Sequence, residues 1–188
     1  CFSFFPGKNL GCYGDGGAVI SKNKELVNWM RMYKDHGRKE KYNHEFIGTN
    51  SRLDAIHAAV LSCKLLHLVD ENEHRRKVAN IYKESLTGCK SFVNTVESVY
   101  HQLVVTVPRD DRAIIMGSLL HNGVSCAIHY PLPVPLTGGY HEEWKNRKSE
   151  FPNAIELSQE VLSLPIHGYI TEEQVDFVCK TFNEAINK

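Results

Sequence analysis

Apolar residues recur at helical spacing along much of the chain. Within residues 24–35 an apolar residue returns every three or four positions and Gly37 follows, which predicts an amphipathic helix. A longer apolar stripe over residues 52–86 predicts a long helix. Its middle, residues 70–77, is heavily charged, so the helix is either interrupted there or exposed to solvent.

Short extended segments are expected between the helices. Residues 11–20 contain four glycines and an apolar end, which predicts a turn that leads into a short buried strand. The glycines permit a positive φ or a close approach of the backbone. Residues 99–107 are rich in β-branched side chains and predict a strand that ends at Pro108, and residues 124–128 predict a second short strand.

The remaining helices are marked by their ends. Asp110 is a plausible N-cap of a helix that stops at Gly123. Further helices are predicted over residues 153–161 and 172–187. The second of these opens on Thr171–Gln174, which has the sequence of a capping box.

Two segments lack a hydrophobic period. Residues 38–51 are polar and predict a loop, and residues 129–150 are rich in proline and glycine, which suit neither a helix nor a core strand. The order of elements is that of a mixed α/β or α+β chain, with a subdomain boundary expected within residues 70–90.

Composition excludes several function classes. The 188 residues are 42% hydrophobic and 23% charged, which is typical of a globular protein of one domain or two small ones and argues against disorder. Lys and Arg together number 22, as do Asp and Glu, so no basic excess indicates nucleic-acid binding. No apolar stretch reaches the about 18–20 residues that a membrane helix needs, and the first residues do not resemble a signal peptide.

Cysteine and histidine usage indicates a cytoplasmic protein without a metal centre. The six cysteines form no Cys-x-x-Cys pair, and the ten histidines form no His-Glu-x-x-His motif. The cysteines are therefore expected to be reduced and mostly buried.

Lys8 is the residue with the most informative chemistry. It lies beside Pro6 and Gly7 in a predicted rigid turn, close to apolar Phe4 and Phe5. Desolvation lowers the pKa of a lysine, and such an amine can form a Schiff base. The alternative is an ordinary surface lysine in a loop, which is the commoner case.

Four ordered motifs resemble the DegT/DnrJ/EryC1 family of sugar aminotransferases, which depend on pyridoxal phosphate. They cover nearly the whole chain: residues 3–11 with 14–18 around the lysine, residues 48–54 with Ala58-Ala59, His129-Tyr130-Pro131-x-Pro133, and Phe151-Pro152 with residues 162–166. The resemblance implies an α/β fold, the C-terminal part of a fold-type I transferase. It assigns residues 1–75 to the end of the pyridoxal-phosphate-binding large domain and residues 76–188 to a small α+β domain.

The resemblance also implies residue roles. Lys8 would be the catalytic Schiff-base lysine, Ser3 would bind the cofactor phosphate, and Asn50 would reach the phosphate of a neighbouring subunit's cofactor in a homodimer with shared active sites. Substrate would be bound by Arg52, at its diphosphate or another acidic group, and by His129 and Tyr130, which would line the sugar pocket.

Structural roles remain open for most of these residues. Asn50 and Arg52 would serve equally well as caps of the long helix, and Ser3 as a turn residue. His129 and Tyr130 would then simply pack under the proline-rich loop.

Two positions depart from the family pattern. His57 stands where the family usually has Gln, and Val134–Thr137 intervene where relatives often continue toward an aromatic residue. The second departure lies in a region that contacts substrate in relatives, so sugar specificity transfers least well.

The expected function is transfer of an amino group from glutamate to a UDP- or dTDP-linked 3-keto or 4-keto sugar, in aminosugar or polysaccharide biosynthesis. The chain begins at Cys1 without Met, whereas relatives carry the acidic partner of the pyridine nitrogen, a stacking aromatic residue and a phosphate cradle before the lysine. The expectation is therefore the C-terminal half of an enzyme, inactive alone. The alternative is a truncated, non-catalytic binding or regulatory module of the same fold.

Overall fold

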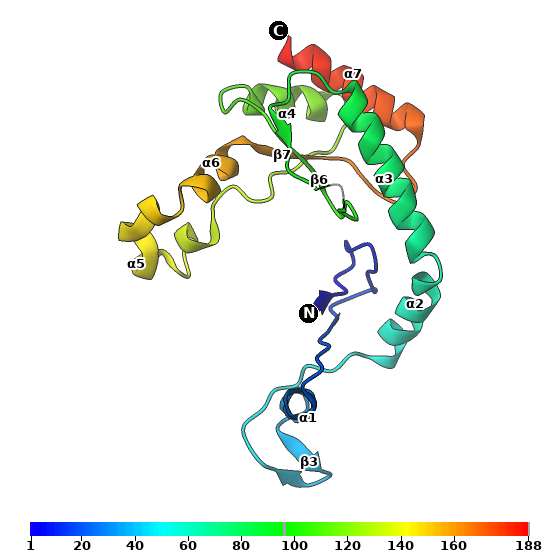
Figure 1. The fold of residues 1–188 in the computed structure, drawn as a ribbon, viewed down its shortest axis with the longest axis vertical. Helices are drawn as coiled ribbons and strands as arrows, with labels where there is room; N and C mark the ends of the chain where they lie inside the picture. Colours follow the sequence, from blue (N-terminus) through cyan, green and yellow to red (C-terminus); the bar gives the residue numbers. More distant parts are fainter. Residues whose placement is uncertain (96, 188) are drawn as a thin grey trace. The chain divides into compact units, whose positions relative to one another are not determined.

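The computed structural model describes residues 1–95 and 97–187. The chain divides into two compact units, Cys1–Asp70 and Glu71–Lys188. Helices and short strands are mixed along it, as the ribbon in Figure 1 shows.

The first unit is built from short elements. A two-residue ladder pairs β1 with β2 antiparallel, and a second ladder pairs β3 with β4. The elements are β1 (Phe2–Ser3), β2 (Gly17–Ala18), α1 (Lys24–Tyr33), β3 (Arg38–Glu40), β4 (Asn43–His44) and α2 (Ala55–Leu65).

Helix α1 confirms the first predicted helix. It begins after Asn23, whose side-chain oxygen accepts a hydrogen bond from the Leu26 N–H at 3.1 Å. It ends at Tyr33, slightly before the predicted end at Asp35. Gly37 then has a φ of +69°, and a Cβ there would lie 1.8 Å from the Phe46 carbonyl oxygen, so only glycine fits.

Three sequence predictions for this unit need correction. The segment 38–51 holds the hairpin β3–β4 rather than only a loop; its strands are polar and mostly exposed, so no hydrophobic alternation marks them. The strand expected within residues 11–20 is reduced to Gly17–Ala18. That strand is not buried, and Val19 and Ile20 beyond it are 50% and 72% exposed.

The long helix predicted over 52–86 is two helices. α2 ends at Leu65 and α3 runs over Leu68–Ser85, so the break precedes the charged stretch 70–77, which is helical. The Leu66 N–H donates to the Cys63 carbonyl and the His67 N–H to the Lys64 carbonyl. Both bonds span three residues, and this tightening of the last turn ends α2.

The second unit contains a three-stranded antiparallel sheet in the order β5-β6-β7. In addition to most of α3, its elements are β5 (Ser91–Phe92), β6 (Leu103–Thr106), α4 (Arg112–His121), the 3₁₀ turn η1 (Val134–Leu136), α5 (His141–Trp144), η2 (Lys145–Glu150), α6 (Pro152–Glu160), β7 (Val161–Leu164) and α7 (Glu172–Ile186).

The hydrophobic core of this unit lies between the sheet and three helices. Helices α4 and α7 contact each other, and Figure 1 shows them with β6 and β7 in one body. The cluster draws apolar side chains from α3, β6, α4, β7 and α7, including Tyr82, Leu103, Ile115, Leu162 and Phe182, each of which is fully buried. Apolar burial on this scale is the main stabilising contribution to the unit.

Several boundaries in the second unit differ from prediction. The strand predicted over 99–107 is limited to β6, and residues 124–128 form only an isolated bridge between Ala127 and Ser163. Strand β7 was not predicted, because its four residues are all buried and therefore show no alternation. α4 begins at Arg112, with Asp111 rather than Asp110 as its N-cap.

The capping box of α7 is confirmed. Thr171 Oγ1 accepts from the Gln174 N–H at 3.3 Å, and Gln174 Oε1 accepts from the Thr171 N–H at 3.0 Å. The proline-rich segment 129–150 is not a continuous loop but holds η1, α5 and η2.

Two general findings concern the described residues. None of their helices is long and apolar enough to cross a membrane. All six cysteines are free thiols, as expected, but only Cys12 and Cys179 are buried and two are exposed.

Candidate functional site

Lys8 lies in a tight turn. Its N–H donates to the Phe5 carbonyl at 2.8 Å, which closes a four-residue turn with Pro6 at the second position. The Lys8 side chain is half-buried. The turn thus holds the lysine on a short, constrained segment, as its sequence predicted.

Backbone hydrogen bonds join the two ends of the segment 3–17, which contains Lys8 and is called the lysine loop from here on. The β1–β2 ladder pairs Ser3 with Gly17, and the Phe4 N–H donates to the Gly16 carbonyl at 2.8 Å. The Cys12 N–H returns a bond of 2.8 Å to the Phe4 carbonyl. The loop is therefore closed by backbone bonds on both sides of Lys8.

The side chains of Cys12 and Lys64 also contact backbone carbonyl groups of this loop. The buried Cys12 Sγ lies 3.0 Å from both the Phe4 and the Gly14 carbonyl oxygens, and its single S–H can donate to either of them. Lys64 Nζ on α2 donates to the Gly11 carbonyl at 2.7 Å. A Cβ on Gly11 would lie 2.4 Å from the Pro6 carbonyl oxygen, so the close approach of the two backbone segments requires glycine.

Ser3 supplies a hydroxyl on the same loop. It is exposed, and its Oγ accepts from the Phe5 N–H at a long 3.4 Å. The hydroxyl proton is thus available for donation to an anion. A primary amine and a hydroxyl donor on one tied loop have the chemistry that pyridoxal phosphate needs at its aldehyde and its phosphate.

Asn50 and Arg52 lie on a second segment, which is bonded to the end of α1. Asn50 forms an isolated antiparallel bridge with Asp35. Arg52 Nη1 donates to Asp35 Oδ1 at 2.9 Å, and its side chain is half exposed. Neither residue caps α2, because the N-cap of that helix is Asp54, so the capping alternative is wrong.

His129 and Tyr130 belong to the second unit. His129 Nδ1 lies 2.8 Å from the Ser163 hydroxyl on β7. Tyr130 meets the His129 ring edge to face with centroids 5.5 Å apart, and it is 70% exposed. Tyr130 therefore does not simply pack under the proline-rich segment.

The predicted site residues fall into three groups. Ser3 and Lys8 share the lysine loop, Asn50 and Arg52 share the segment after the hairpin, and His129 and Tyr130 lie in the other unit. Sequence reasoning missed three supporting residues: Asp35, Lys64 and Ser163. The contacts that relate them to the site, to Arg52, Gly11 and His129, lie 17, 53 and 34 positions away in the chain, so no local pattern marks these contacts.

His57 adds an unexplained polar atom near the lysine loop. Its Nδ1 is buried and has no hydrogen-bond partner among the described residues. Its ring lies against Gly14, where a Cβ would come within 2.7 Å of Cε1.

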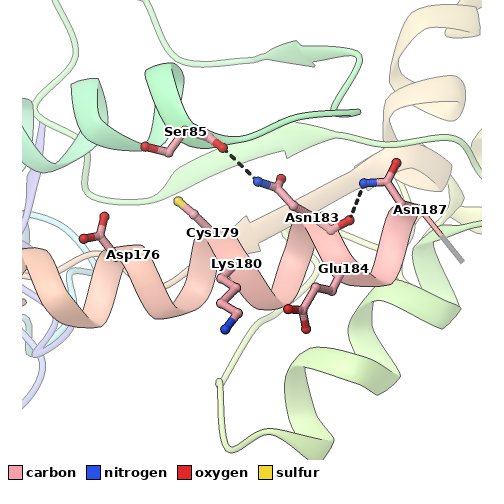
Figure 2. A pocket seen from close by; sticks show the side chains of 7 residues that line it. All are labelled: Ser85, Asp176, Cys179, Lys180, Asn183, Glu184 and Asn187. Atoms are coloured by element: carbon pink, nitrogen blue, oxygen red, sulfur yellow. Dashed lines mark hydrogen bonds between the residues drawn. The ribbon is translucent and has the colours of Figure 1, made fainter.

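A groove of about 680 Å³ in the second unit is lined by none of the predicted site residues and lies between the end of α3 and α7. Figure 2 shows its seven lining side chains, which include Ser85, Asp176 and Cys179. Burial, together with the charge of Asp176, raises the pKa of the Cys179 thiol to about 12, so the groove offers no reactive thiolate. No group of three or more potential metal ligands occurs among the described residues either.

Comparison with known proteins gives a consistent result over the whole chain. A model of the DegT/DnrJ/EryC1/StrS aminotransferase family matches residues 1–183. The dTDP-3-amino-3,4,6-trideoxy-alpha-D-glucose transaminase of Streptomyces venezuelae is 40% identical over 178 residues, which are 92% of this chain and 46% of that protein. The UDP-2-acetamido-2-deoxy-3-oxo-D-glucuronate aminotransferase of Pseudomonas aeruginosa is 38% identical over 95% of this chain and 49% of that protein.

Solved structures show the same relation. The crystal structure of S. venezuelae DesV in complex with a ketimine intermediate has a TM-score of 0.91 and 38% identity, over 100% of this chain and 51% of that one. The chain spans about half the length of the curated relatives it matches. Members of the matching family bind pyridoxal or pyridoxamine phosphate.

Proposed function

The chain belongs to the DegT/DnrJ/EryC1/StrS aminotransferase family, and on that premise we propose that its protein transfers an amino group from glutamate to the keto carbon of a nucleotide-linked sugar. The observation that carries the proposal is Lys8, held in a closed turn on a tied loop within the motif that this family shares. Glutamate becomes 2-oxoglutarate and the ketone becomes an amine, so atoms and electrons balance.

The cofactor of this reaction is pyridoxal phosphate. When bound, it would supply an electron sink for the negative charge that develops at the substrate carbon, and an aldehyde carbon that can carry the amino group. Lys8 Nζ would hold the cofactor covalently, and the same amine would hold or move the proton at the substrate carbon. The Ser3 hydroxyl donates a hydrogen bond to the phosphate, where a charge-assisted bond is strong.

The other predicted site residues bind the cofactor phosphate or orient the substrate. Asn50 donates to the phosphate in the partner subunit of a homodimer, and Arg52 binds the diphosphate of the nucleotide sugar as a guanidinium fork. His129 and Tyr130 line the sugar pocket. Residues 1–75 form the end of the large, cofactor-binding domain, and residues 76–188 form the small α+β domain.

The names of two relatives support a 3-keto sugar as substrate. One acts on a dTDP-linked 3-amino sugar and the other on a UDP-linked 3-oxo sugar, at 40% and 38% identity. We therefore propose a UDP- or dTDP-linked keto sugar, with amination at C3 favoured over C4.

Turnover tests the proposal on the intact gene product with cofactor. Formation of 2-oxoglutarate from glutamate is measured with dTDP- and UDP-linked 3-keto and 4-keto sugars. Lys8→Ala is expected to lower kcat by at least roughly 10²–10⁴-fold, the range of acid–base catalysis alone. Lys22→Ala, an exposed lysine after β2, is the matched control and should retain activity.

Two results would contradict the proposal. Turnover that survives Lys8→Ala removes the role of this lysine. Binding of a nucleotide sugar without turnover by the wild-type protein indicates the non-catalytic binding module instead.

A further inference from the structure

One carboxylate in the first unit holds two guanidinium groups. Asp35 Oδ1 accepts from Arg52 Nη1 at 2.9 Å, and Asp35 Oδ2 accepts from Arg38 Nη2. The Asp35 side chain is only 18% exposed, whereas the side chains of Arg38 and Arg52 are 38% and 50% exposed. The Asp35 carboxylate is therefore less exposed to solvent than the two guanidinium groups that it contacts.

Backbone hydrogen bonds join residues 33–35 to residues 49–51, which lead to Arg52. The bridge between Asp35 and Asn50 is flanked by bonds from the Thr49 N–H to the Tyr33 carbonyl at 2.8 Å and from the Ser51 N–H to the Lys34 carbonyl at 2.9 Å. The chain leading to Arg52 is thus fixed, and the carboxylate fixes the end of its side chain.

The charge balance favours an anion at this place. Two guanidinium groups share one carboxylate, so the cluster carries a net positive charge. Partial burial raises the pKa of Asp35, but hydrogen bonds and charges from Arg38 and then Arg52 lower it further, so the net shift is downward and the acid stays ionised at neutral pH. Each guanidinium has five N–H donors, and Asp35 uses only some of them.

We propose that Asp35 is a positioning residue, which holds Arg52 and the neighbouring Arg38 as a paired guanidinium site for the diphosphate of the nucleotide sugar. The inference rests on the proposed function, because it deepens the role given there to Arg52. It adds Arg38 as a second cation at the diphosphate and gives Asp35 an indirect part in binding.

Nucleotide binding separates this role from a purely structural one. The dissociation constant of UDP and of dTDP is measured by calorimetry on the intact gene product and on Asp35→Ala, Arg52→Ala and the double variant. Because the Asp35–Arg52 ion pair is partly exposed and screened by solvent, Asp35→Ala should weaken binding of the preferred nucleotide by about 2–10-fold. In the Arg52→Ala background the same substitution should have much less effect, because its main target is gone.

Two further variants control for folding. Glu45→Ala removes the other ion pair of the hairpin, in which Lys39 Nζ lies 2.9 Å from Glu45 Oε1, and should leave nucleotide binding unchanged. Asp35→Asn preserves the shape and one acceptor, so it serves if Asp35→Ala does not fold. It should weaken binding less than removal of the side chain does. KM for the keto sugar should rise in these Asp35 variants, while KM for glutamate and kcat stay close to wild type.

The outcomes distinguish a failure of the role proposed for Asp35 from a failure of the proposed aminotransferase function. An active wild type whose nucleotide affinity is unchanged by Asp35→Ala, or is lowered equally in both backgrounds, overturns the inference alone. A wild type that neither binds nucleotide nor transfers an amino group overturns the proposed function.

Discussion

The hydroxyl of Ser163 fixes the imidazole of His129. The two side chains are 2.8 Å apart, and Ser163 is 6% exposed on β7, where its backbone also exchanges hydrogen bonds with Ala127. A partner on Nδ1 restricts the rotation of the ring and leaves Nε2 for another contact. A sugar-binding role for His129 would therefore depend on Ser163.

Ser163→Ala is expected to raise KM for the keto sugar several-fold and to lower the free energy of unfolding by about 1 kcal/mol, as for one hydrogen bond. Ser158→Ala is the matched control, since that serine is also buried but its hydroxyl only donates to the Ile155 carbonyl within α6. Steady-state kinetics and denaturant unfolding measure both effects. An equal rise of KM in the two variants would exclude a specific role of Ser163.

The candidate site was only partly predictable from individual residues. Lys8 and Ser3 lie in a contiguous motif, and the turn that holds the lysine follows from Pro6 and Gly7. Asp35 and Ser163 have no such signal, because each is defined by a partner that only the folded chain brings close. The roles assigned to the site residues remain predictions.

At the scale of elements, the segment between β7 and α7 contains a histidine sensitive to pH. Partial desolvation, with the charges of Arg75 and His74, lowers the pKa of His167, although the residue is exposed. Its Nδ1 accepts from the Tyr169 N–H at 3.2 Å, which requires an unprotonated nitrogen. The neutral form is thus the form that the fold favours.

Acidification should therefore destabilise the protein through His167. The pKa of the folded state lies below that of the unfolded state, near 6.5, so the contribution of the neutral ring is present above that pH and is lost as the pH falls. Between about pH 8 and about pH 5.5, the melting temperature should fall more for the wild type than for His167→Gln. Thermal unfolding at both pH values measures this, and equal falls would contradict it.

The sequence predicts an element only where it carries an apolar period or a capping residue. Helices α1 and α7 have both an apolar stripe and a capping residue, and both lie where the sequence placed them. The polar hairpin β3–β4 and the fully buried β7 have no alternation, so a period of two could not reveal them. The α/β fold class is confirmed, and the chain matches half of a solved sugar aminotransferase.

At the scale of the whole molecule, apolar surface is unevenly distributed. Among residues 1–70 only Cys12 and Leu61 are buried apolar residues, whereas Ile47, Leu66 and Ile56 are 96%, 80% and 76% exposed. Because residues 1–75 are proposed to be only the end of the large domain, apolar side chains exposed here would contact either the rest of that domain or the partner subunit. The proposed homodimer assigns Ile56 to the second of these contacts.

Ile56→Glu on α2 is expected to shift the intact gene product from dimer to monomer, because a charge replaces apolar contact surface. Ile114→Glu on α4 is the matched control, since Ile114 is 59% exposed in the unit that has its own core. Analytical ultracentrifugation measures both. A dimer that tolerates Ile56→Glu, or a monomeric wild type, would contradict the proposed interface.

The central claim is that Lys8 is the residue that binds pyridoxal phosphate covalently. The most direct measurement is borohydride reduction of the intact gene product loaded with pyridoxal phosphate in the absence of glutamate, followed by peptide mass spectrometry. We expect the pyridoxyl group on Lys8 Nζ and its loss in Lys8→Ala, with Lys22→Ala labelled as the wild type. A label on another lysine, or none in a protein that transfers amino groups, would contradict the claim.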